Sequence, residues 1–310
     1  MKIIVTGALG HIGSKLIRDP ILIEACNEIV IIDNLSTQKF GSLFNLPSGV
    51  KYTLYQGDVA QEFPVALSES VDAVIHLAGI TDPLASVSDP NSLFDNNLRI
   101  TKHIADICAA TGTPLVFVST TSVYTSTDAN VDETCTDLAP TSPYALCKLE
   151  EEAYVLDVLR DADSAIFRLG TIFGVSPGMR FHTAVNNFCW QAACGQPIEV
   201  WSTAMDQLRP YLALSDATAA LTRTVLEHIY PGEIVNAVTC DATVRDVLAA
   251  ISGFGCPTNV CLVDSAVMNT LSFRTSTEKA ANLGFVFQGD LQSDVFDTLN
   301  LLRGLSAPVG

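Results

Sequence analysis

The sequence of 310 residues predicts an α/β fold, in which a doubly wound parallel sheet is joined to a smaller, interwoven C-terminal lobe. Three observations predict it. Short, almost entirely apolar segments alternate with helical patterns in the first half of the chain, and a glycine-rich turn follows the first of them. After about residue 170 the alternation becomes irregular, without a low-complexity tract or flexible linker. Continuous apolar strands are typical of a parallel sheet that helices cover on both faces.

The expected elements follow in chain order. Strands are predicted over residues 2–7, 28–33, 52–58, 72–79 and 114–120. Helices are predicted from residue 11 and over residues 96–111, 183–194 and 214–229. Between the later helices the pattern favours a loop over residues 173–181 and a short strand over residues 197–201.

Composition excludes several classes of protein. The formal net charge of −17 and the pI near 4.5 disfavour nucleic acid and anionic membrane surfaces as partners, because both would be repelled. Nine scattered cysteines form no CxxC pair and no metal-binding spacing, so we expect reduced thiols, no metal and a cytoplasmic protein. The chain enters a strand directly, so we expect no signal peptide, and no apolar stretch approaches the ~20 residues of a membrane span.

The stretch "VTGALGHIGS" indicates a dinucleotide site. Gly7, Gly10 and Gly13 follow the first strand and open a helix, where missing side chains permit a tight turn and close approach to a pyrophosphate. Asp33 ends the second strand and can accept both ribose hydroxyls, which favours NAD over NADP, although Lys39 lies nearby in the sequence. The alternative is that these glycines only shape a βα turn. The motif predicts a Rossmann-type NAD-binding domain over residues 1–170, to which segments near 210–240 return, and a mainly substrate-binding lobe over residues 171–310.

The stretch "TSPYALCK" indicates a catalytic pair. Ser142 fits an N-cap and Pro143 the first helical position, so Tyr144 and Lys148 share one helix face. The helix N-terminus and the ammonium are both expected to lower the pKa of the Tyr144 phenol from ~10, which would make it a base near neutral pH. Thr120, at the end of a predicted strand, is our choice for the hydroxyl that holds the same substrate oxygen. The alternative is an exposed amphipathic pair.

Over nearly its whole length the chain resembles an extended short-chain dehydrogenase/reductase of the sugar-nucleotide epimerase/dehydratase branch, similar to UDP-galactose 4-epimerases. The resemblance is carried by "TGALGHIGS", "QGDV", "HLAGITDPLASVSDPNSLFDNN", "STTSVY" and "YALCK". It implies a catalytic triad of Thr120, Tyr144 and Lys148. The cofactor contacts predicted from the motifs and this resemblance together are Gly7, Gly10, His11, Ile12, Gly13, Asp33, Asn34, Asp58, Val59, Leu77, Ala78, Gly79, Asn97, Tyr144 and Lys148.

Departures from the family pattern bear on the reaction and the substrate. Thr121 and Ser122 stand where 4,6-dehydratases carry acidic residues, so dehydration is not expected. Thr81 replaces a lysine, Thr171 an asparagine and Pro210 an aspartate of related segments. Three arginines of the second lobe are candidates for a diphosphate, the alternative being solvated surface arginines paired with carboxylates. The predicted substrate-binding residues are Thr81, Thr120, Thr171, Arg180, Arg209 and Arg274.

The predicted function is an NAD-dependent epimerase of a nucleotide-diphosphate sugar, acting at C4 through a transient keto intermediate. The alternatives are a sugar-nucleotide ketoreductase or dehydrogenase, a non-catalytic NAD-sensing relative, and a small-alcohol or flavonoid-type reductase. A homodimer through the helix of residues 96–111 and the helix that begins at Tyr144 is expected. We expect the His11 side chain to point outward, His76 to be a hydrogen-bonded core histidine, and Trp190 and Trp201 to have packing roles.

Overall fold

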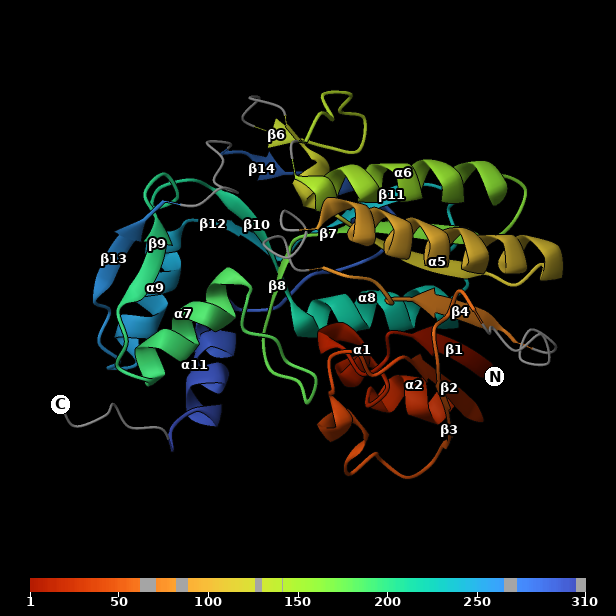
Figure 1. Ribbon diagram of the computed structural model, residues 1–310, viewed down its shortest axis with the longest axis horizontal. Coiled ribbons are helices and arrows are strands. Elements are labelled where there is room, and N and C mark those ends of the chain that lie inside the picture. The colour runs from red at the N-terminus through yellow and green to blue at the C-terminus, as the bar shows by residue number, and fades with distance from the viewer. Residues whose placement is uncertain (62–70, 82–88, 126–129, 141, 265–271, 305–310) are drawn as a thin grey trace.

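The computed structural model describes residues 1–61, 71–81, 89–125, 130–140, 142–264 and 272–304. A seven-stranded sheet forms its larger part, in the strand order β11-β7-β5-β4-β1-β2-β3, with every pairing parallel (Figure 1). Its strands are β1 (Lys2–Thr6), β2 (Glu28–Asp33), β3 (Lys51–Gln56), β4 (Ala73–His76), β5 (Leu115–Thr120), β7 (Ser164–Leu169) and β11 (Ile234–Ala237). The predicted α/β class with a parallel sheet is confirmed.

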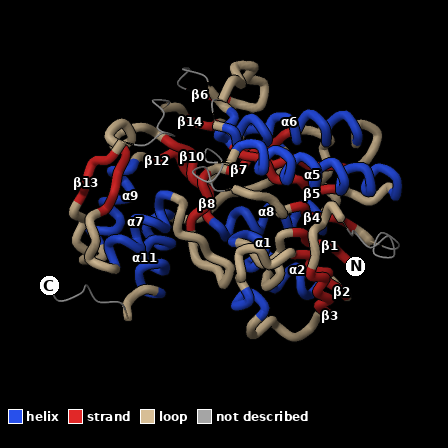
Figure 2. The backbone as a smooth tube through the Cα atoms, in the orientation of Figure 1, coloured by secondary structure: helices blue, strands red, loops and turns tan. Residues whose placement is uncertain are grey.

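Helices cover both faces of this sheet, as Figure 2 shows. Alternate residues of a strand point to opposite faces, and β1 displays this clearly. Ile3 and Val5 pack in one apolar cluster with Leu221, whereas Ile4 packs in another with Ile104. The first face carries α1 (His11–Leu16), α2 (Pro20–Ala25) and α8 (Leu214–Leu226), and the second carries α5 (Pro90–Thr111) and α6 (Pro143–Val158).

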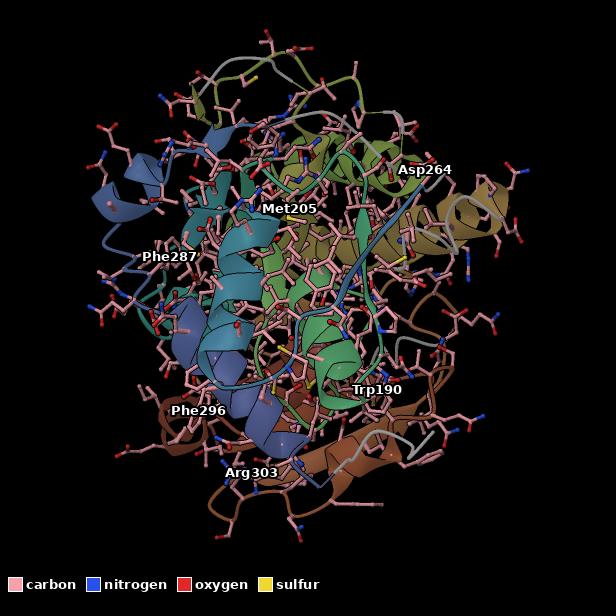
Figure 3. All side chains as sticks on the ribbon, turned by 90° about the vertical axis from the view of Figure 1, so that its left-hand side faces the viewer. Trp190, Met205, Asp264, Phe287, Phe296 and Arg303 are labelled. Carbon is pink, nitrogen blue, oxygen red and sulfur yellow. The ribbon has the colours of Figure 1, made fainter. Side chains whose placement is uncertain are left out.

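The second lobe has a separate apolar core among three helices, which lie side by side in Figure 3. These helices are α7 (Ala184–Ala193), α9 (Val244–Gly253) and α11 (Leu291–Leu301). The described residues also form three small sheets. One contains β8 (Thr171–Phe173), β10 (Arg209–Ala213) and β12 (Cys240–Ala242). The others pair β9 (Ile198–Trp201) with β13 (Val260–Val263) and β6 (Asn130–Val131) with β14 (Arg274–Thr275). Among the described residues, the other short helices are η1 (Phe40–Leu43), η2 (Thr121–Val123) and α10 (Glu278–Asn282).

The predicted strands and helices are confirmed with shifted ends. The helix expected over residues 96–111 begins earlier, at Pro90, because Asp89 accepts a hydrogen bond from the Ser92 amide and proline suits the first helical position. The chain passes between the lobes more than once: α8 packs on α1, and β11 pairs with β7 in the large sheet. No helix in the described part of the chain is long and apolar enough to span a bilayer.

The hydroxyl-rich end of β5 is explained by a buried ion pair. Arg168 and Glu152 form a two-pronged contact at 2.9 and 2.7 Å, with side chains only 2% and 3% exposed. The Ser119 hydroxyl donates to the same carboxylate, and the Tyr124 ring lies 4.9 Å from the guanidinium carbon. The Tyr124 hydroxyl in turn donates to Asn236 at 2.8 Å. These side chains connect β5, α6, β7 and β11 at the same end of the sheet.

Replacing Arg168 by methionine should lower the free energy of unfolding by about 3–5 kcal/mol, because Glu152 would keep a buried charge without its counterion. The matched control is Arg160→Met, since Arg160 pairs with Asp157 at side-chain exposures of 67% and 70%. That change should cost less than about 1 kcal/mol. Urea denaturation of the variants measures both values, and equal losses would contradict a structural role for the buried pair.

Candidate active site

The glycine loop leaves no room for side chains. Gly7 has a φ of +63°, and a Cβ there would lie 2.7 Å from the Ala78 backbone, where β4 ends. A Cβ on Gly13 would lie 2.6 Å from the Ala8 backbone. Gly10 is the N-cap of α1 and has no side chain to cover the first amides of the helix. The loop therefore fits the close backbone approach that a dinucleotide pyrophosphate requires.

Asp33 lies beside this loop at the end of β2. Its carboxylate accepts hydrogen bonds from the amides of Leu9 at 3.1 Å and Leu35 at 2.9 Å. An acidic group held there suits the ribose hydroxyls of NAD and repels a 2′-phosphate. Lys39, which the sequence left as a possible phosphate partner, donates to the carbonyl oxygens of Gly178 and Met179. The arrangement fits NAD.

The other predicted cofactor contacts border the same loop or lie behind it. Asn97 is fully buried, and its amide group donates to the Ile80 carbonyl and accepts from the Ile80 amide, both at 2.8 Å. It thereby positions the turn after β4; a direct cofactor contact stays a prediction. Asp58 accepts from Arg99 at 2.9 Å, and Val59 is buried. The contacts predicted at Ile12, Asn34, Leu77, Ala78 and Gly79 likewise stay predictions.

Residues 174–181, which we call the strap, lie against the glycine loop. His11 donates through Nε2 to the Gly174 carbonyl at 2.8 Å, and the Ser176 hydroxyl donates to the His11 carbonyl at 2.9 Å. The Gly178 amide donates to the Ser14 hydroxyl at 2.8 Å. The expectation that the His11 side chain points outward is therefore wrong. Its burial, together with the charge of Arg180, lowers the pKa of His11 to about 3, so the ring is neutral.

Gly178→Ala should displace the strap, because the new Cβ would lie 2.2 Å from the Leu9 carbonyl oxygen and 2.4 Å from that of Gly10. We expect a loss of about 1–3 kcal/mol of stability from this overpacking and a lower NAD content after purification. Gly253→Ala is the control, since nothing lies within 4 Å of a Cβ there. Thermal melts and extraction of bound nucleotide provide the measurements. An unchanged NAD content in Gly178→Ala would show that the position of the strap does not affect cofactor retention.

Tyr144 and Lys148 occupy the first turns of α6. Ser142 is the N-cap residue, as predicted, but its side chain makes no capping hydrogen bond, and Pro143 is at the first helical position. Tyr144 is half-buried. Lys148 is buried, donates to the Val118 carbonyl at 3.1 Å and lies 4.6 Å from the Phe117 ring centre. The lysine is thus fixed against β5.

The expected decrease in the pKa of Tyr144 is contradicted. Burial raises this pKa above its ordinary value, and the positive charges of Lys148 and Arg180 only partly oppose the effect. For Lys148, burial by itself would lower the pKa, but Glu151 and Tyr144 outweigh it and the pKa is raised. Glu151, which the sequence analysis overlooked, lies three residues after the lysine and forms an ion pair with it at 3.1 Å. The i,i+3 spacing in "KLEEE" was the signal.

Thr120 ends β5 on the side of the sheet where α6 begins. Its hydroxyl oxygen accepts a hydrogen bond from the Ser122 amide at 3.1 Å, and the residue is 8% exposed. Accepting this bond fixes the oxygen, while the hydroxyl hydrogen can still be donated. The next residue, Thr121, directs its hydroxyl to the Leu169 carbonyl at 3.3 Å. Of these two neighbours, Thr120 is the better donor to a ligand.

A chain of buried hydrogen bonds connects α6 to the turn after β4. The Thr6 hydroxyl oxygen accepts from the amides of Leu77 and Ala78, both at 3.2 Å, and lies 2.7 Å from His76 Nδ1. His76 Nε2 lies 3.2 Å from the Thr101 hydroxyl, which donates to Glu151. Because amides only donate, the protons of this chain all point toward the carboxylate. His76 is the buried, hydrogen-bonded histidine that the sequence predicted.

Burial, with a smaller contribution from Lys148, lowers the pKa of His76 to about 3. In the unfolded chain the His76 ring has an ordinary pKa of ~6.5. Below that pH the unfolded state binds a proton that the folded state does not, so the free energy of unfolding decreases as the pH falls. Between about pH 7.5 and about pH 5.5, the free energy of unfolding of the wild type should decrease by about 1.4 kcal/mol more than that of His76→Gln. Urea unfolding at both pH values tests this difference, with His228→Gln at an exposed position as control. A pH-independent difference for His76→Gln would contradict the neutral buried ring.

The predicted substrate residues fall into two groups. In one, Arg180 of the strap donates to the Thr81 hydroxyl and lowers the pKa of Tyr144 through its charge. In the other, the Arg209 guanidinium of β10 lies 5.9 Å from the Phe273 ring centre. Arg274 follows Phe273 in the sequence and is exposed, and its strand β14 packs on β10. Thr171 pairs with Tyr211 at the start of β8. Whether all three arginines bind one diphosphate stays a prediction.

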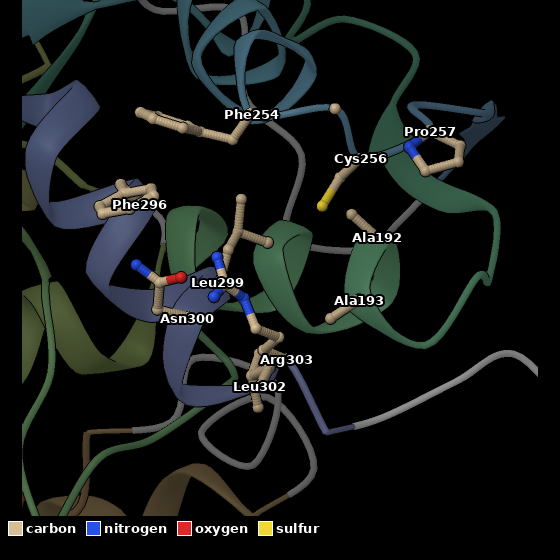
Figure 4. A pocket seen from close by; sticks show the side chains of 11 residues that line it. Ala192, Ala193, Phe254, Cys256, Pro257, Phe296, Leu299, Asn300, Leu302 and Arg303 are labelled. Atoms are coloured by element: carbon tan, nitrogen blue, oxygen red, sulfur yellow. The ribbon is translucent and has the colours of Figure 1, made fainter.

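A cavity of about 260 Å³ lies in the second lobe, among α7, α9 and α11, and Figure 4 shows its lining. Phe254 and Phe296 lie across one side of it, and Cys256 and Arg303 contribute polar atoms. It contains none of the predicted site residues. Among the described residues, no group of three His, Cys, Asp or Glu side chains could hold a metal, and all nine cysteines are free thiols.

The NAD dependent epimerase/dehydratase family matches residues 3–237, more than half of the chain. The chain belongs to this family. NAD is the cofactor, in agreement with the glycine loop and Asp33. The resemblance drawn from the motifs is thereby confirmed.

Curated relatives carry out more than one reaction. The protein named uncharacterized UDP-glucose epimerase YtcB, from Bacillus subtilis (strain 168), is 28% identical over 246 residues, 76% of each chain. The Streptomyces lividans UDP-glucose 4-epimerase is 31% identical over 55% of this chain and 50% of its own. The Streptomyces antibioticus dTDP-glucose 4,6-dehydratase is 31% identical over 52% and 49%. The chain thus aligns with about half the length of the last two.

Solved structures share the fold over almost the whole chain. The Thermus thermophilus UDP-glucose 4-epimerase in complex with NAD has a TM-score of 0.82 and 23% identity, covering 98% of this chain and 99% of that one. MoeE5 in complex with UDP-glucuronic acid and NAD has a TM-score of 0.84 with the same identity and coverage. At this identity the likeness establishes the common fold and nothing finer.

Proposed function

We propose that this protein is an NAD-dependent epimerase of a nucleotide-diphosphate sugar that inverts C4. The observation that carries the proposal is the grouping of Tyr144, Lys148 and Thr120 where α6 packs on the end of β5. Family membership supplies the cofactor and the class of chemistry. The nucleotide sugars bound in related structures support the substrate class.

In the proposed mechanism the Tyr144 phenolate removes the proton from the C4 hydroxyl, and Thr120 donates a hydrogen bond to the same oxygen. NAD, when bound beside the glycine loop, would supply the reversible hydride acceptor for C4. Lys148 stabilises the phenolate electrostatically and, since it also donates to the Val118 carbonyl, keeps a constant position. Tyr144 would give the proton back to the C4 oxygen as the keto sugar is reduced from its opposite face. The configuration at C4 is then inverted.

Epimerisation is favoured over elimination by the residues after Thr120. A 4,6-dehydration requires an acid and a base in addition to the tyrosine, and the positions where they would stand hold Thr121 and Ser122. Thr121 is buried and donates to a backbone carbonyl. Neither hydroxyl has the pKa of a carboxylic acid, so neither can replace the missing pair. Epimerisation needs no acid or base in addition to the tyrosine.

A ketoreductase or dehydrogenase is the second candidate, because the same three residues serve a reaction that consumes cofactor. For the substrate, we propose that Arg209 binds the diphosphate, since its segment resembles a substrate-binding segment of the family and the guanidinium fork suits phosphate geometry. We also propose a homodimer through α5 and α6, which lie side by side in Figure 1 and leave Leu146 40% exposed.

Purified protein incubated with UDP-, dTDP-, GDP- and CDP-sugars, without added NAD, should interconvert one pair of C4 epimers, followed by proton NMR. Conversion should increase toward alkaline pH, since burial raises the pKa of Tyr144 and only its phenolate acts as base. Tyr144→Phe should reduce the rate by about 10²–10⁴-fold, while the bound NAD content stays the same. A 4-keto-6-deoxy product would instead identify a dehydratase. Conversion only with added reduced cofactor would identify a ketoreductase.

A further inference from the structure

Glu151 brings a second charge to the Tyr144–Lys148 pair. It lies one turn after Lys148 on α6, and its Oε2 is 3.1 Å from the lysine Nζ. The two side chains are 1% and 5% exposed, so solvent barely screens their interaction. A buried carboxylate is costly unless it is paired and hydrogen-bonded. Its presence beside the candidate base therefore calls for a role.

The carboxylate is held from both sides. Oε2 faces Lys148 of its own helix, whereas Oε1 accepts a hydrogen bond from Thr101 of α5. Behind Thr101 come His76 and Thr6, whose protons point toward the carboxylate. A chain of donors that ends on a carboxylate stabilises its ionised form. An ion pair and a hydrogen bond thus hold Glu151 in a fixed position.

We propose that Glu151 is a positioning residue that locks the Lys148 ammonium against the end of β5 and divides its charge between two anions, the Glu151 carboxylate and the Tyr144 phenolate. The inference deepens the proposed function, because it concerns the base of that reaction. Glu151 itself is placed behind the lysine and acts through it.

The consequence follows from the charges around the phenol. Tyr144 faces the positive charges of Lys148 and Arg180 and, on its own helix, Glu151 and the neutral Cys147 thiol. Among the described residues, Thr101 and the neutral His76 ring lie behind Glu151. An ammonium that is already paired with a carboxylate attracts a phenolate less than an unpaired one does. Glu151 therefore fixes the lysine while moving ionisation of the tyrosine to higher pH.

The test is a pH titration of the purified protein, in which tyrosine ionisation is followed by ultraviolet absorbance near 295 nm. Subtracting the curve of Tyr144→Phe leaves the signal of Tyr144. Glu151→Gln should shift the midpoint of the Tyr144 signal down by about one pH unit, which is tenfold more phenolate at a fixed pH below both midpoints. The matched control is Glu150→Gln, a loss of the same charge from the exposed neighbouring position, which should leave the midpoint unchanged. An unchanged or higher midpoint in Glu151→Gln overturns the proposal.

Two further measurements keep the outcome decisive. If Glu151→Gln does not fold, as judged by circular dichroism, Glu151→Leu removes the same charge and should give the same downward shift. In the activity assay, the acid limb of the kcat/KM profile should move down by the same amount in the variant, which a purely structural role would not cause. Because the titration needs no substrate, a protein inactive toward sugar nucleotides would refute the proposed function while leaving the role of Glu151 to the absorbance result.

Discussion

The parallel pairing of β1, β4 and β5 is the constraint on which the site depends. It sets Thr6 beside His76 and His76 beside Phe117, so the carboxyl ends of three strands meet at one edge of the sheet. Two parts of the proposed site start from this edge: the glycine loop follows β1, and Thr120 ends β5. A shift of one residue in either pairing would turn these side chains to the opposite face.

Two buried ion pairs lie where α6 meets this edge, one within the helix and one between the helix and β7. Adjacent residues, Glu151 and Glu152, point to different partners: the first to Lys148 and Thr101, the second to Arg168 and Ser119. Burying charge yields little net stability, but a mispaired arrangement would be costly, and this cost favours one position of the helix. The same contacts thereby hold the base of the proposed reaction and the strands behind it.

The strap couples the second lobe to the cofactor loop through three hydrogen bonds, and Lys39 closes it from the other side. A side chain on Gly178 would collide with two backbone carbonyls of the glycine loop. The strap and the glycine loop can therefore pack this closely only because position 178 is a glycine. A loop that begins in the second lobe thus completes the surface around the dinucleotide site. We therefore expect cofactor retention to depend on both lobes together.

The sequence alone determined the fold class, the glycine loop, the Asp33 position and the Tyr144–Lys148 spacing. These features are local: apolar runs define strands, and short spacings along one helix define neighbours. Only the tertiary structure decided that His11 faces the strap, that Thr101 of α5 donates to Glu151 and that burial raises the pKa of Tyr144. Each of these depends on how segments distant in the chain exclude water from a charged or polar group. The extent to which water is excluded is set by packing, so no local pattern of residues predicts it.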